Sequence, residues 1–325
     1  MELGGLHHVT AVTGRAPENV AFYTGVLGLR LVKKTVNQDD VSAYHLFYGD
    51  EVGNPGTELT FFDWSWVGPD PAGSGRISAT ALRVPDRAAL DWWARRFDDL
   101  GVERSGIESR NGRAGLSFTD PEGQNLELAD GGKSGPQPGN PYQGSPVPRE
   151  KAILGLHASM LVVRDIGPTS RVLTRALGFR PAGEYEKDGA RVVVFEVGPG
   201  GPGTEVHLEE SPGLRPHRQV GTGGVHHVAF RTPDGEELAA WREKLRRLGI
   251  PVTPVVDRYY FRSVYFREPG GVLFEIATDG PGFAIDEDAG HLGERLSLPP
   301  MLEPYRETIE DGLQSIPPAG EGVFR

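Results

Sequence analysis

The stretch GLHHVTAV, residues 5–12, sets two adjacent histidines in a run of apolar and β-branched residues, and nearly the same phrase, GVHHVAF, returns at 224–230. A third version, GLHASMLV at 155–162, keeps the first histidine and has alanine in place of the second. β-Branched runs of this kind predict strands. A strand phrase that recurs at distant places in one chain indicates an internal structural repeat.

The segments that follow these phrases repeat as well. RISATALRVPD at 76–86 aligns with GVHHVAFRTPD at 224–234 at an offset of 148, and each leads into an amphipathic segment that predicts a helix. At the same offset, DPEGQNLELAD aligns with EPGGVLFEIATD, which pairs Glu127 with Glu275. The repeats predict an α+β fold built from four βαβββ modules.

A Gly- and Pro-rich stretch, GGKSGPQPGNPYQGSPVPRE at 131–150, divides the chain of 325 residues into near halves. We therefore predict an N-terminal domain with modules one and two, a linker, a C-terminal domain with modules three and four, and a tail with a short helix. Their predicted bounds are 1–131, 132–150, 151–280 and 281–325.

Composition limits the classes of function. A formal net charge of −11 disfavours nucleic acid and anionic membrane surfaces as partners. The chain has no cysteine, so disulfides, thiolate metal sites and a cysteine nucleophile are excluded. The N-terminus shows no signal-peptide pattern, and these features together predict a cytoplasmic protein.

The βαβββ repeat resembles the vicinal-oxygen-chelate superfamily, which includes glyoxalases, extradiol dioxygenases and drug-sequestering proteins. The resemblance covers about residues 5–280. It implies that the modules pair into two barrel-like domains around a cavity. Since the superfamily contains enzymes and binding proteins alike, the function depends on the residues in the cavity.

Three residues have the pattern of a metal site. Side chains alternate between the two faces of a strand, which predicts that His8 and His227 point into the cavity and that His226 points away unless a bulge intervenes. Glu275 interrupts an apolar strand, where a lone carboxylate is costly unless it is paired or bound to metal. Two imidazoles and one carboxylate suit Fe(II) with open coordination positions.

The other two modules lack this set. His8 aligns with Ala158 and His227 aligns with Ala79, whereas Glu127 keeps the carboxylate position. We predict that modules one and four surround the metal, and that modules two and three form a vacant cavity in which Glu127 is a paired structural remnant. The remaining candidates are predicted to be structural or solvated histidines: His157, His207 and His217.

A closer resemblance, to the para-hydroquinone ring-cleaving dioxygenases, spans nearly the whole chain. The matching phrases are LHHVT, YHLFYGDEVGNPGTELTFF, VHHVAF, DRYYFRSVYFREPGGVLFEIATD and LPPMLEPYRETIEDGL. The resemblance implies that His8, His227 and Glu275 bind Fe(II), with Mn(II) as a second option. It also implies that four residues lie around the substrate and metal: Thr10, His226, Arg258 and Tyr265. The implied substrates are O2 and an aromatic diol.

Two alternatives stay open. A glyoxalase-type isomerase would use Zn or Ni, but such sites usually carry a second carboxylate, and here Thr60 and Phe62 hold the candidate positions. A non-enzymatic protein that sequesters an aromatic drug or quinone would have no need for the metal set. The predicted tail helix, in EPYRETIEDGL, is expected to dock on the surface or on a neighbouring subunit of a homo-oligomer.

Overall fold

The computed structural model describes residues 1–132 and 135–316. Residues 133–134 of the predicted linker and 317–325 of the predicted tail lie outside the described residues. The first two modules contain the following elements: β1 (Leu6–Thr13), α1 (Ala16–Val20), η1 (Ala21–Val26), β2 (Arg30–Asn37), β3 (Asp40–Gly49) and β4 (Glu58–Asp63), then β5 (Arg76–Val84), α2 (Arg87–Leu100), β6 (Arg104–Arg110), β7 (Arg113–Thr119) and β8 (Asn125–Asp130).

The third and fourth modules repeat this order. They contain β9 (Gly155–Val163), α3 (Ile166–Arg171), η3 (Val172–Ala176), β10 (Arg180–Lys187), β11 (Ala190–Glu196) and β12 (Glu205–Glu210), then β13 (Val225–Thr232), α4 (Gly235–Arg247), β14 (Val256–Asp257), β15 (Arg262–Arg267) and β16 (Leu273–Thr278). The four βαβββ modules predicted from the repeats are thus confirmed.

The two longer helices begin at the Pro-Asp steps of the repeated phrase. Asp86 accepts a hydrogen bond from the Ala89 amide at the start of α2, and Asp234 does the same for two amides at the start of α4. An aspartate that caps these otherwise unpaired amides favours a helix start at that residue. The buried residues of α4 are Leu238, Trp241 and Leu245, spaced so that one face packs against the sheet.

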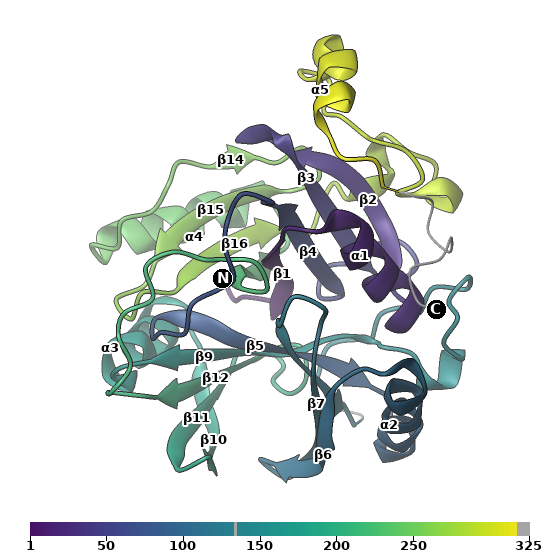
Figure 1. Ribbon diagram of the computed structural model, residues 1–325. Helices are drawn as coiled ribbons and strands as arrows, with labels where there is room; N and C mark the ends of the chain where they lie inside the picture. The colour runs from purple at the N-terminus through teal and green to yellow at the C-terminus, as the bar shows by residue number, and fades with distance from the viewer. Residues whose placement is uncertain (133–134, 317–325) are drawn as a thin grey trace.

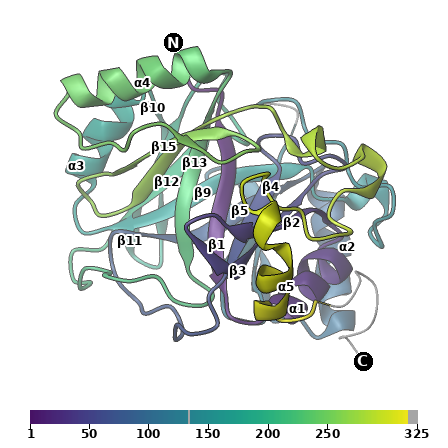
Figure 2. The same cartoon turned by 90° about the horizontal axis from the view of Figure 1, so that it is seen from above.

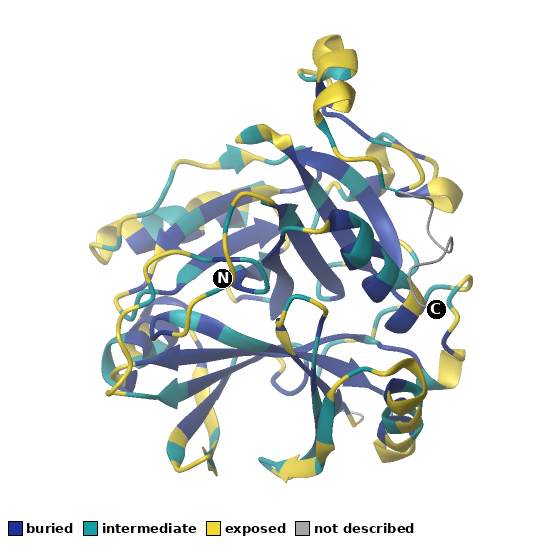
Figure 3. Ribbon diagram, viewed as in Figure 1, coloured by how far each residue is buried: buried dark blue, intermediate teal, exposed yellow. Residues whose placement is uncertain are grey.

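The strands form two curved halves (Figure 1). One half has the order β2-β3-β4-β1-β13-β16-β15-β14 and joins module one to module four. The other has the order β10-β11-β12-β9-β5-β8-β7-β6 and joins module two to module three. Each curved half of the sheet therefore combines a module from the N-terminal part of the chain with a module from the C-terminal part. The strands at the centre are buried, whereas α5 (Arg306–Gly312) is mostly exposed (Figure 3).

The segment after β16 folds back over module one. It contains three short 3-10 turns, η4 (Phe283–Ile285), η5 (Ala289–His291) and η6 (Glu303–Tyr305), and ends in α5, which lies near β2 and β3 (Figure 2). Leu298 and Ile309 pack on Val36 of β2, so this tail contacts the edge strand of the curved half that joins modules one and four. Within the described residues, no helix combines the length and apolar character needed to span a membrane.

Candidate metal centre

Both His-His pairs lie where the pairing of β1 with β13 slips in register. One slip lies between Leu6 and Val9, at the His7–His8 step, and a second puts an extra residue in β13 at His226. A bulge of this kind breaks the strict alternation of side chains. The expectation from alternation alone, that His226 points away from the cavity, is therefore wrong: His226 lines the cavity.

The residues predicted as ligands come together. Nε2 of His8 lies 3.3 Å from Nε2 of His227, and Oε2 of Glu275 lies 3.2 Å from the first and 2.8 Å from the second. His8 comes from β1, His227 from β13 and Glu275 from β16, which runs parallel to β13. All three side chains are buried, so three ligand atoms converge on one point away from bulk water.

The donor set fits a cation. Although Oε2 of Glu275 is close to both imidazoles, it has no hydrogen-bond partner among the described residues, while its other oxygen accepts from the Ser263 hydroxyl. Burial alone would raise the pKa of Glu275, but the two imidazoles outweigh it and hold the pKa well below its usual range. A buried carboxylate with one orphaned oxygen facing two imidazole nitrogens is a ready ligand set for a divalent metal.

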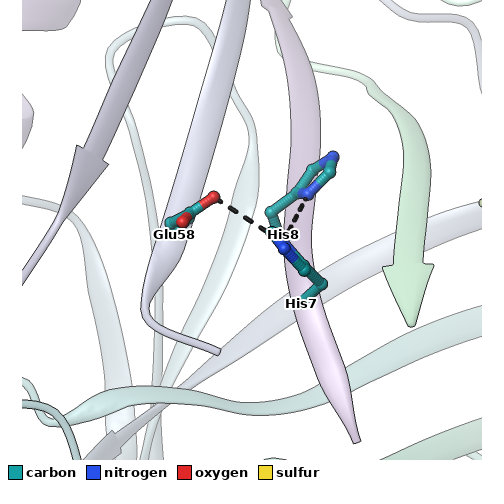
Figure 4. Close-up of side chains that lie close together, drawn as sticks. All are labelled: His7, His8 and Glu58. Atoms are coloured by element: carbon teal, nitrogen blue, oxygen red, sulfur yellow. Dashed lines mark hydrogen bonds and ion pairs between the residues drawn. The ribbon is translucent and has the colours of Figure 1, made fainter. Parts of the chain in front are cut away.

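A second cluster of buried histidine and carboxylate side chains, His7, His8 and Glu58, lies beside the candidate metal site. Nδ1 of His7 is 2.9 Å from Nδ1 of His8 and 3.8 Å from Oε2 of Glu58 (Figure 4). Because the two nitrogens share a hydrogen bond, neither is free to bind a metal between them. Burial and the nearby Asp50 raise the pKa of Glu58 well above its usual range, which favours a neutral carboxylic acid here.

The metal set borders a cavity of about 320 Å³. Its walls are mainly apolar and aromatic, and they include Phe47, Phe62 and Trp64 from module one and Phe261 and Tyr265 from module four. The rings of Phe62 and Trp64 stack with centroids 5.2 Å apart and an interplanar angle of 14°. Flat aromatic walls of this kind suit a small planar ring.

Two further predicted site residues, Arg258 and Tyr265, share one wall of this cavity. The Arg258 Nε donates to the Tyr265 hydroxyl at 3.1 Å, and its Nη2 lies 2.9 Å from Asp39 of the β2–β3 turn. Burial raises the pKa of Tyr265, and the charge of Glu275 adds to this, so the phenol keeps its proton at neutral pH. Asp39 carried no prediction because its contact with Arg258 joins residues 219 apart in the chain.

Thr10 is buried but does not line the cavity. Its hydroxyl lies 2.8 Å from that of Thr60, which in turn lies 3.0 Å from Nε2 of His45. Thr60 pairs with Thr10 on parallel strands just as Glu275 pairs with Ala229, so Thr60 takes the place that a fourth ligand would occupy. His45, which lines the cavity, was missed from the sequence, although its phrase YHLF places it on one strand face with Phe47.

The counterpart cavity between modules two and three carries ion pairs in place of this ligand set. Nη1 of Arg110 lies 2.8 Å from Oε2 of Glu127, and both line a cavity of about 390 Å³. The register slips of β5 and β9 recur here at Ser78 and His157, but alanine stands at both ligand positions. The bulges thus belong to the fold, whereas the candidate ligand histidines occur in modules one and four.

His157 gives a pH-dependent stability prediction. Burial lowers its pKa from 6.5 to about 3, so the unfolded chain binds a proton below pH 6.5 that the folded chain does not. The free energy of unfolding should therefore fall by about 2 kcal/mol between pH 7 and pH 5 through this group. His157→Gln, which keeps an acceptor for Arg113, should show a correspondingly weaker pH dependence in urea unfolding. An unchanged dependence would contradict a neutral, buried His157.

Comparison with known proteins supports the assignment of the fold. The family model described as the Glyoxalase/Bleomycin resistance protein/Dioxygenase superfamily matches residues 5–128 and 155–276. The protein named "Putative ring-cleaving dioxygenase MhqA" from Bacillus subtilis (strain 168) is 48% identical over 97% of this chain and 100% of its own length. The "Chlorohydroquinone/hydroquinone 1,2-dioxygenase" of Sphingobium indicum is 34% identical, with 94% of each chain covered.

Solved structures agree with this comparison. A crystal structure described as a "putative dioxygenase" from Bacillus subtilis superimposes with a TM-score of 0.89 at 39% identity, covering 97% of this chain and 98% of the other. Glyoxalase I from Zea mays shares the fold alone, with a TM-score of 0.63 at 16% identity over 85% of this chain and 92% of its own. The four modules, the paired bulges and these matches show that the chain belongs to the Glyoxalase/Bleomycin resistance protein/Dioxygenase superfamily.

Proposed function

We propose that the protein is an Fe(II)-dependent, extradiol-type ring-cleaving dioxygenase that acts on a hydroquinone or a related aromatic diol. The observation that carries the proposal is the convergence of His8, His227 and Glu275, with an orphaned carboxylate oxygen, at the edge of an aromatic cavity. The names of relatives that match over nearly the whole chain support the same reaction class.

Fe(II) held by these three residues would supply open coordination positions for O2 and one ionised hydroxyl of the diol. The remaining work falls to the protein. Phe62 and Trp64 offer flat apolar surfaces to the ring. Arg258, a cation in the cavity wall, is placed to hold the negative charge that develops on the substrate oxygens.

His226 is placed to hold or move a proton. Its Nδ1 lies 2.8 Å from Nδ1 of His227. When Nε2 of His227 binds a metal, its Nδ1 carries the hydrogen and donates to His226. Burial lowers the pKa of His226 to about 3, so the ring is neutral and its hydrogen lies on Nε2. His226 thus offers a donor to the substrate, and Tyr265, which also lines the cavity, offers a second.

Oxygen consumption tests the proposal directly. Protein loaded with Fe(II) under anaerobic conditions, mixed with hydroquinone and then with labelled O2, should consume one O2 per ring opened and place both oxygen atoms in the ring-opened acid. Catechols run in parallel identify the ring pattern, and Mn(II)-loaded protein tests the second metal. If no diol leads to consumption of dissolved oxygen, the proposed dioxygenase reaction is contradicted. If the diol is in addition recovered unchanged, a non-enzymatic binding protein is favoured.

Tyr265→Phe should lower kcat by about 10²- to 10⁴-fold, because the variant keeps the ring but loses a proton donor in the cavity wall. The metal content should stay at the parental level, since Tyr265 is not a ligand. Tyr259→Phe is the matched control: it removes a neighbouring phenol that does not line the cavity, and should leave kcat unchanged. Steady-state kinetics on metal-loaded proteins of measured iron content distinguish these outcomes.

A further inference from the structure

The first histidine of the pair in β1 has a complete set of hydrogen-bond partners. His7 is 1% exposed, and its Nε2 lies 3.0 Å from the carbonyl oxygen of Thr278. Its Nδ1 lies 2.9 Å from Nδ1 of His8. Both ring nitrogens of His7 are therefore engaged, one by the end of β16 and one by its neighbour in the chain.

These contacts dictate where the hydrogens lie. A carbonyl oxygen can only accept, so Nε2 of His7 carries a hydrogen and donates it to Thr278. A neutral imidazole has one N–H, which leaves a lone pair on Nδ1 of His7. The hydrogen between the two Nδ1 atoms must then belong to His8, because two lone pairs at 2.9 Å would repel.

The consequence for His8 is that Nε2 has no hydrogen. This is the nitrogen that faces Glu275 and His227. We infer that His7 is a positioning residue, which fixes His8 in the one tautomer whose Nε2 lone pair is free to bind the metal. The inference rests on the metal centre of the proposed function, and it gives a chemical role to the first histidine of the HHV phrase.

Glu58 does not compete for this role. Its Oε2 is 3.8 Å from Nδ1 of His7, beyond hydrogen-bond distance, and this oxygen has no hydrogen-bond partner within residues 1–132 and 135–316. In Figure 4, His7 lies between Glu58 and His8, and the second ring nitrogen of His8 points away from His7. If His7 instead donated from Nδ1, His8 would have to accept there, and its Nε2 would carry a hydrogen and could not bind a metal.

The third module provides a matched internal control. His157 occupies the same bulge position as His7 and is similarly buried, but the next residue is Ala158. Nε2 of His157 accepts from Arg113 at 2.9 Å, and its Nδ1 has no hydrogen-bond partner in the part of the chain that the structure describes. A buried histidine at this bulge therefore need not orient a neighbour, and the tautomer-fixing contact is specific to His7.

Two near-isosteric replacements separate this role from simple packing. His7→Asn places an amide oxygen where Nδ1 stood, so it still accepts from His8 but loses the Thr278 contact. His7→Gln places its amide nitrogen where Nε2 stood, so it keeps the Thr278 contact but has no acceptor for His8. His157→Gln tests for a general effect of removing a buried histidine from this bulge.

Co(II) affinity, measured by chelator competition on purified protein, is the readout, with thermal unfolding of each metal-free variant measured alongside. We expect His7→Gln to bind Co(II) about 10- to 100-fold more weakly than the parent, and His7→Asn and His157→Gln to bind within a few fold of it. In Co(II)-loaded parent protein, proton NMR should show two shifted, exchangeable ring N–H signals, one from each ligand histidine. His7→Gln should lose or broaden the one from His8.

If His7→Gln binds Co(II) as tightly as the parent, or if His7→Asn binds it as weakly as His7→Gln, the positioning role is overturned. Glu275→Ala separates this failure from a failure of the proposed function. If Glu275→Ala retains Co(II), the proposed metal centre itself is contradicted. If Glu275→Ala loses Co(II) while His7→Gln binds it with parental affinity, only the proposed role of His7 is contradicted.

Discussion

Replacing Glu275 with alanine should abolish binding of Fe(II), because the variant removes one of the three proposed protein ligands and the only anionic one among them. The same holds for His8→Ala and His227→Ala, since each contributes one of the three atoms that converge within 3.3 Å. Metal content after anaerobic loading and desalting, together with titration of Co(II) as a spectroscopic probe, measures the effect. We expect near-stoichiometric metal in the parent and none above background in these variants.

Glu127→Ala is the control for this experiment. Glu127 takes the same place in its own module, but its carboxylate pairs with Arg110 at 2.8 Å and alanines stand where the histidines would be. Its removal should leave the metal content intact and cost about 1 to 3 kcal/mol of unfolding free energy, because Arg110 loses a largely buried partner. Equal loss of metal from Glu127→Ala would contradict the assignment of the site to modules one and four.

Replacing Lys33 with methionine should lower the free energy of unfolding by about 3 to 5 kcal/mol, because it breaks a buried ion pair and leaves its carboxylates uncompensated. The side chain of Lys33 in β2 is fully buried, and its Nζ lies 2.7 Å from Asp286 and in contact with Glu287. It also lies 4.9 Å above the ring of Tyr260, a cavity residue. The pair thus joins the tail to the wall of the cavity.

Lys187→Met is the matched control for that prediction. Lys187 also pairs with a glutamate, Glu209, at 3.4 Å, but both side chains are more than a fifth exposed. Exposed pairs contribute little, so this variant should change the unfolding free energy by less than about 1 kcal/mol. Urea unfolding of both variants at pH 7 gives the comparison, and an equally small effect at Lys33 would show that the tail does not depend on this contact.

The module count and the convergence of His8, His227 and Glu275 could be predicted from the sequence because both depend on local, repeated patterns. A strand phrase that recurs at fixed offsets indicates the repeat, whatever the pairing of its strands. Likewise, Glu275 in an otherwise apolar strand is unfavourable in any buried setting without a partner. The pairing of Glu127 with a nearby charge could be predicted on the same ground.

Other features depend on which strands pair and in what register. His226 lines the cavity only because of the bulge where β13 pairs with β1, and a slip of one residue reverses the face of every side chain beyond it. The partner of Lys33 lies 254 residues away in a tail for which the sequence predicted only a docked helix. The sequence by itself determined the repeated modules and the chemistry of the candidate ligand set. Only the tertiary structure decided the neighbours of each ligand, since hydrogen bonds between distant strands depend on their register and leave no periodic pattern in the chain.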